Sequence, residues 1–164
     1  LSGETAVGEF PLEAIRMMKS ITLNVESEIA AEQEFKDLVI TPDKSDVKNS
    51  ICFSAYQMSK DLSIKVMVIM TESGDTGNTM SSFRPISTII AMTPSKRVYR
   101  RLSLSWGISP VKVRDFRSTD QMLSFIKKFL IENKLIKRGE LFIMTPGVPV
   151  GITGSTNMIK VEIA

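Results

Sequence analysis

Histidine is absent from this sequence of 164 residues. Without an imidazole, the chain cannot build a Ser-His-Asp triad, a Cys-His pair or a histidine-ligated zinc site. Cys52 is its only cysteine, so an internal disulfide is excluded and a reducing compartment is expected. Because Cys52 lies in an apolar helical context, we expect a packed thiol there rather than a nucleophile.

Long hydrophobic runs are missing as well. No apolar stretch reaches the roughly 18 residues that a membrane span needs, so no membrane partner is expected. The opening LSGETAVGEF has neither the basic nor the apolar region of a secretory signal, and it does not resemble a natural start. The net charge of +3 combines 21 basic with 18 acidic residues. This near balance argues against nucleic acid as a partner, and we interpret the basic run at 96–101 as a solvated helix face.

Apolar strands alternate with helical segments from residue 64 onward. The run IKVMVIM at 64–70 is typical of a strand covered on both faces. Further strands are expected at 87–92, 111–113, 140–144 and 158–163, and helices at 11–31, 45–60, 76–83, 96–106 and 120–136. This order predicts a three-layer α/β/α sandwich with a five-stranded, mostly parallel sheet. The last strand follows the fourth without an intervening helix and is therefore expected to run antiparallel.

Two polar loops are candidate ligand sites. Three strands end in a Met-Thr pair, which predicts that their loops leave from one edge of the sheet. The loop 71–77 joins the central strand to a helix start, and the loop 147–157 is rich in glycine. Loops of this kind can present backbone N–H groups to an anion. The candidate residues are Thr71, Ser73, Gly74, Asp75, Thr76, Gly154, Ser155 and Thr156. Taken alone, the first loop is better explained as an ordinary strand–loop–helix turn whose hydroxyls serve only as caps.

Five segments carry a resemblance to a known family. They are LSGETAVGEFPLEAIRMM, IMTESGDT, SFRPISTIIAMTPS, RRLSLSWGISPV and IKRGELFIMTPGVPVGITGSTNMIKV. In order and spacing they resemble the C-terminal part of pyruvate kinase, over essentially the full chain. The resemblance implies that residues 1–31 are the remnant of a barrel domain, its final strand end and helix. It also implies that residues 32–164 form the C-terminal α/β domain, with strand order 3-2-1-4-5 and an antiparallel fifth strand.

The resemblance also implies a function. The whole enzyme transfers a phosphoryl group from phosphoenolpyruvate to ADP in glycolysis, in the cytoplasm, with magnesium and potassium. Its catalytic and metal-binding residues precede the position of Leu1, so this fragment is expected to hold no cofactor and to be inactive alone. The family's C-terminal domain contributes to tetramer assembly. In many members it binds a regulatory sugar phosphate or nucleotide, here expected between the 71–77 and 147–157 loops.

One departure from the family concerns charge. Asp75 stands where many members carry a basic or neutral polar residue, and Glu72 adds a second negative charge. We therefore expect only a weak phosphate site, centred on Ser73 and Thr76. Two alternatives remain open: a free-standing phosphometabolite-binding module of the same fold, and an independent enzyme. Against an independent enzyme, the sequence contains neither histidine nor any evident acid–base pair.

Overall fold

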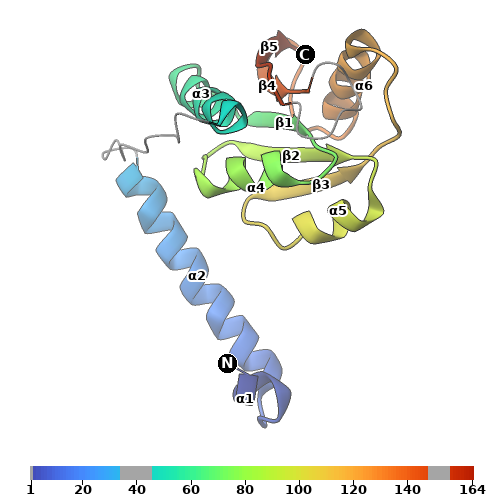
Figure 1. The fold of residues 1–164 in the computed structure, drawn as a ribbon. Helices are drawn as coiled ribbons and strands as arrows, with labels where there is room; N and C mark the ends of the chain where they lie inside the picture. Colours follow the sequence, from blue (N-terminus) through green and yellow to red (C-terminus); the bar gives the residue numbers. More distant parts are fainter. Residues whose placement is uncertain (1, 34–45, 148–155) are drawn as a thin grey trace. The chain divides into compact units, whose positions relative to one another are not determined.

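The computed structural model describes residues 2–33, 46–147 and 156–164 (Figure 1). The chain divides into two compact units, Leu1–Ile40 and Thr41–Ala164. Among the helices of the described ranges, none combines the length and apolar character that a membrane crossing requires.

The first unit contains two helices, α1 (Ser2–Ala6) and α2 (Pro11–Gln33). Proline occupies the first turn of α2, where backbone N–H groups have no partner within the helix, so its missing N–H costs no helical hydrogen bond. The apolar side chains of this helix are largely exposed: Leu12 is 65%, Ile15 53% and Met18 39% accessible. The second helix was expected from the sequence. The short α1 was not.

The second unit is built on one five-stranded sheet. Its strands are β1 (Val66–Met70), β2 (Thr88–Thr93), β3 (Ile108–Lys112), β4 (Leu141–Thr145) and β5 (Lys160–Ile163). Their spatial order is β3-β2-β1-β4-β5; the first four are parallel and β5 pairs antiparallel with β4. The strand order, the parallel strands and the antiparallel final strand are all confirmed.

Helices cover both faces of this sheet (Figure 1). They are α3 (Val47–Asp61), α4 (Asp75–Ser82), α5 (Lys96–Leu102) and α6 (Thr119–Glu132). Because side chains alternate along a strand, Ile90 and Ala91 of β2 face opposite sides. Ile90 belongs to the core that α6 contributes to, whereas Ala91 packs with Val98 and Leu102 of α5. The α/β/α layering is therefore confirmed.

Two helices end earlier than the sequence indicated. Helix α5 stops at Leu102 rather than near residue 106, because the N–H of Ser105 turns back to the Leu102 carbonyl, 3.0 Å away. Helix α6 stops at Glu132 rather than near residue 136. There Lys134 adopts a left-handed φ of 56°, and the N–H of Leu135 bonds to the Leu130 carbonyl at 2.9 Å. This 6→1 bond is the helix-ending motif that glycine usually makes possible.

The edge strand β3 begins at Ile108, three residues before the expected position. Its register is fixed by hydrogen bonds from Ile89 N–H to the Gly107 carbonyl and from Val113 N–H to the Thr93 carbonyl. In a parallel pair this pattern turns the backbone groups of Ile108, Pro110 and Lys112 away from β2. Proline has no N–H, so the outer edge of β3 is poor in donors.

Candidate functional site

Three buried threonines lie at the carboxyl ends of the parallel strands. Thr71 follows β1, Thr93 ends β2 and Thr145 ends β4, with 7%, 0% and 0% of their surfaces exposed. The N–H of Thr71 bonds to the Met92 carbonyl at 3.0 Å and extends the β1–β2 pairing by one residue. The expected exit of three Met-Thr pairs at one sheet edge is thus observed. In α/β sheets this edge is where ligands usually bind.

The hydroxyls of the first loop serve its own backbone. Gly74 N–H donates to Thr71 Oγ1 at 2.8 Å, and Asp75 N–H donates to Ser73 Oγ at 3.3 Å. Gly74 has a φ of 89°, a conformation that glycine adopts without steric cost, and α4 begins directly after it. The hydroxyls of Thr71 and Ser73 therefore satisfy backbone N–H groups of the turn itself, as one of the two readings of this loop expected, but the N-cap of α4 is Gly74, which provides no side-chain cap.

The structure brings the two predicted loops into contact through Thr76 and Thr156. Their hydroxyl oxygens lie 2.7 Å apart, and the two side chains are 4% and 6% exposed. Thr156 also forms an isolated antiparallel bridge with Gly147, which positions it across the connection from β4 to β5. The two other candidates of this loop, Gly154 and Ser155, lie outside the described residues.

Arg101 is a loop contact that the sequence interpretation missed. Its guanidinium Nη2 donates a hydrogen bond to the Ser73 carbonyl and lies 3.9 Å from Asp75 Oδ1. A Cβ atom on Gly74 would come within 2.8 Å of the same nitrogen, so glycine also leaves room for the guanidinium. The side chain of Arg101 is 50% exposed, so a ligand in solvent can reach it. The spacing of residues along a helix turns Arg101, and not Arg100, toward the loop, and this spacing is the sequence signal that could have identified Arg101.

The residues of the loop 71–77 themselves carry a net negative charge, from Glu72 and Asp75. Asp75 is exposed, and Glu72 is partly buried. Burial, and secondly the nearby carboxylate of Asp115, raises the pKa of Glu72 above its usual value. A further negative charge close to this carboxyl would raise the pKa of Glu72 again.

Thr145 carries a polar atom without a partner. Its Oγ1 is buried and makes no hydrogen bond within the part of the chain that the structure describes. Met144 faces the α6 core, so alternation along β4 turns Thr145 toward the face that α3 and α4 cover. Buried hydroxyls usually find a partner. This one lies at the strand end that borders both candidate loops.

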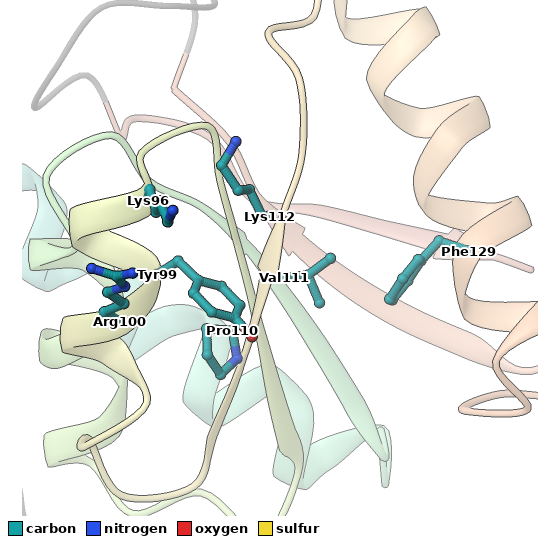
Figure 2. Close-up of a pocket in the computed structure, with 7 residues that line it drawn as sticks. All are labelled: Lys96, Tyr99, Arg100, Pro110, Val111, Lys112 and Phe129. Atoms are coloured by element: carbon teal, nitrogen blue, oxygen red, sulfur yellow. The ribbon is translucent and has the colours of Figure 1, made fainter.

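A groove of roughly 540 Å³ lies along the edge strand β3 and contains none of the predicted site residues (Figure 2). Its lining consists of Lys96, Tyr99, Arg100, Pro110, Val111, Lys112 and Phe129. Tyr99 lies beside Pro110 on the α5 side, whereas Val111 and Phe129 lie on the other side of the strand. Proline and cationic side chains are a common protection of an exposed sheet edge against pairing. That role accounts for Pro110 and for the basic residues Lys96, Arg100 and Lys112 without a ligand.

Metal and thiol chemistry find no support in the described ranges. They hold no group of three or more cysteine and acidic side chains that could bind a metal ion. Burial raises the pKa of Cys52 to about 12, and the thiol is fully buried. Its Sγ lies 3.9 Å from the Thr76 carbonyl, a contact that fits a packed thiol beside the start of α4.

Comparison with known proteins agrees with this arrangement. The family described as pyruvate kinase, alpha/beta domain, matches residues 49–162. Pyruvate kinases from Staphylococcus aureus strains USA300 and NCTC 8325 are each 39% identical to the chain over 166 aligned positions. These alignments cover 99% of the chain but 28% of each relative's length. The chain therefore belongs to the pyruvate kinase family, and its second unit carries the α/β domain of that family.

Proposed function

We propose that this chain is the regulatory and assembly part of a pyruvate kinase and binds a phosphorylated effector between the 71–77 and 147–157 loops. The observation that carries the proposal is the contact of 2.7 Å between the hydroxyls of Thr76 and Thr156, which joins the two loops at the carboxyl edge of the sheet. β1 and β4 are neighbours there, while the helices that follow β1 and β3 cover opposite faces. Such a divergence of connections is a usual place for a ligand in this fold class.

The chemistry of this edge suits a phosphate group. The N-terminus of α4 provides backbone N–H groups and the positive end of its dipole, to which anions are attracted. The hydroxyl of Ser73 and the guanidinium of Arg101 lie beside it. Asp75 and Glu72 act against a phosphate through like charge. The balance favours weak binding, of a sugar phosphate or a nucleotide.

Calorimetry on the whole chain tests the proposal. A sugar bisphosphate, a sugar monophosphate and AMP would be titrated at low salt into the unaltered protein and into Asp75→Asn. We expect weak binding of at least one of them, stronger after Asp75→Asn. Ser73→Ala should weaken it, with Ser82→Ala as the control because Ser82 is an exposed hydroxyl at the far end of the same helix. Absence of binding to either protein would leave these hydroxyls with their role in the turn alone.

The remaining parts of the proposal concern the whole enzyme. Phosphoryl transfer from phosphoenolpyruvate to ADP in glycolysis depends on positioning and on metal ions. Magnesium and potassium would be held by residues outside this chain, within a cytoplasmic tetramer. We expect the chain alone to produce no pyruvate from phosphoenolpyruvate and ADP in a coupled assay. Turnover by the purified chain would contradict this part.

The alternative is a free-standing phosphometabolite-binding module of the same fold. Both functions share the loop site, so ligand binding does not separate them. The coding sequence upstream of Leu1 does, because a barrel domain that reads directly into LSGETA supports the enzyme. A stop codon immediately upstream would support the module.

A further inference from the structure

We propose that Arg101 is the phosphate-binding cation of this loop and that Asp75 is an internal competitor for it. This inference rests on the proposed phosphate site and deepens it. In the structure the guanidinium of Arg101 contacts the Ser73 carbonyl and lies 3.9 Å from Asp75 Oδ1. When a phosphate binds, Arg101 exchanges the carboxylate of Asp75 for the phosphate oxygens and keeps its backbone contact.

The geometry allows this exchange without movement of the fold. A guanidinium has five donors in a planar fork, and Nη2 alone serves the two contacts seen here. Planar forks of this kind bind phosphate oxygens in pairs. The contact to the Ser73 carbonyl anchors the fork next to the first turn of α4, where the phosphate is expected. Gly74 has no side chain that would separate the fork from the loop.

The energetics favour the phosphate over Asp75. The carboxylate and guanidinium are 62% and 50% exposed and lie at the outer limit of an ion pair. Pairs of this kind contribute little to stability because water and salt screen them. A phosphate with nearly two negative charges and three acceptor oxygens forms stronger, charge-assisted hydrogen bonds. Asp75 therefore lowers the affinity without blocking the site.

This exchange gives the acidic residue in the loop a specific role. An acidic residue in the loop weakens phosphate binding twice, by direct repulsion and by holding the cation. Removing Asp75 should relieve both effects, whereas removing Asp75 in the absence of Arg101 should relieve only the repulsion. The two side chains are therefore expected to be coupled in binding, which a double-mutant cycle measures.

The experiment follows inorganic phosphate and a sugar bisphosphate by phosphorus NMR, on the whole chain at low salt. The cycle comprises the unaltered protein, Arg101→Gln, Asp75→Asn and the double variant, with Arg97→Gln as an exposed control on the same helix. We expect Asp75→Asn to tighten binding about 2- to 5-fold. Arg101→Gln should weaken it about tenfold or more. Arg97→Gln should change it by less than about twofold.

A second readout separates binding from a purely structural role. A neighbouring cation lowers the second pKa of a bound phosphate from its usual value of about 6. Arg101→Gln should raise this pKa toward the free value, and Arg101→Lys should restore most of the shift. A residue that only holds the loop in shape would leave the phosphate pKa unchanged. Thermal unfolding of each variant confirms that the compared proteins are folded.

The outcomes distinguish this inference from the proposed function. If Ser73→Ala weakens phosphate binding and Arg101→Gln does not, the site stands and the role of Arg101 is overturned. If Asp75→Asn tightens phosphate binding by the same factor in the unaltered protein and in Arg101→Gln, the exchange is likewise overturned. If neither the unaltered protein nor Asp75→Asn binds phosphate or the sugar bisphosphate, the proposed function and this inference both fail.

Discussion

The hydroxyl oxygens of Thr76 and Thr156 lie 2.7 Å apart although 80 positions separate them in the chain. Thr76 belongs to the first turn of α4, and Thr156 precedes the last strand. Both side chains are buried, so water does not replace this hydrogen bond when it is lost. The pair therefore connects the turn after β1 to Thr156, which lies between β4 and β5 in the chain, and it holds these two residues together at the sheet edge.

This pair leads to the first prediction. Thr76→Val leaves the Thr156 hydroxyl buried without its partner, and we expect the free energy of unfolding to fall by about 1–3 kcal/mol. Thr76→Ser keeps the hydroxyl and should recover most of that loss. Urea unfolding followed by circular dichroism measures both variants. Equal stability of the Val and Ser variants would show that the hydrogen bond contributes nothing.

Gly74 provides the second prediction, with Gly107 as its matched control. Both glycines have left-handed φ values, 89° and 66°, but only the Cβ of an alanine at Gly74 would meet neighbouring atoms. Gly107→Ala should cost only the conformational penalty of about 1–2 kcal/mol. Gly74→Ala should cost more, because its Cβ would lie 3.1 Å from Cγ1 of the buried Val98; the flexible guanidinium of Arg101, 2.8 Å away, can move aside. Chemical denaturation gives both values; a smaller loss at Gly74 than at Gly107 would contradict this reading of the contact.

Glu162 provides a pH-dependent prediction. Hydrogen bonds from Lys160 at 2.7 Å and from Lys127 at 2.9 Å hold the pKa of Glu162 below its usual 4.5. Since the folded-state pKa is lowered, the stabilisation is present above the unfolded pKa and is lost as pH falls through the folded one. Glu162→Gln should destabilise the protein by about 1 kcal/mol at pH 7, and by less near pH 3.

Denaturant unfolding at both pH values tests this. Glu132→Gln is the control, because the pair of Glu132 with Lys128 is 3.8 Å long and its two side chains are 63% and 73% exposed. We expect that control to change stability little at either pH. A loss for Glu162→Gln that is the same at pH 7 and pH 3 would exclude the ionised carboxylate as its cause.

The fourth prediction concerns helix α2. Its apolar side chains are half exposed or more at most positions, including Leu12 at 65% and Ile21 at 55%. Helices with few buried apolar contacts open at low free-energy cost. Its backbone amides should therefore exchange with solvent much faster than those of Val66–Met70, as hydrogen exchange mass spectrometry can show. Equal protection of α2 and β1 in a proven monomer would contradict the prediction.

Much of the fold could be predicted from the sequence because a buried parallel strand needs a continuous apolar run. The run at 64–70 satisfies that need, and β1 is where it was expected. The end of α6 could not be predicted in the same way. The residue with left-handed φ is Lys134, and its type does not indicate the conformation as glycine would.

The candidate site shows the same limit. The two loops could be named because their composition is unusual and because the family resemblance makes β1 and β4 neighbours. Arg101 could not be found from charge alone, since the run 96–101 contains four basic residues that look alike in sequence. Which of them reaches the loop depends on how α5 is rotated against the sheet. That rotation is set by the packing of Val98 and Leu102 on Ala91.

The outer edge of β3 has a consequence for growth of the sheet. Pro110 has no N–H there, and the N–H of Ile108 bonds to the Ser105 carbonyl at 3.4 Å. Lys112 alone is left to donate to an added strand along this edge. If both edge strands of a sheet can pair with other copies, the copies can form an endless fibre. If only one edge strand can pair, two copies form a closed dimer. A single proline in an edge strand thus favours finite assemblies over fibres.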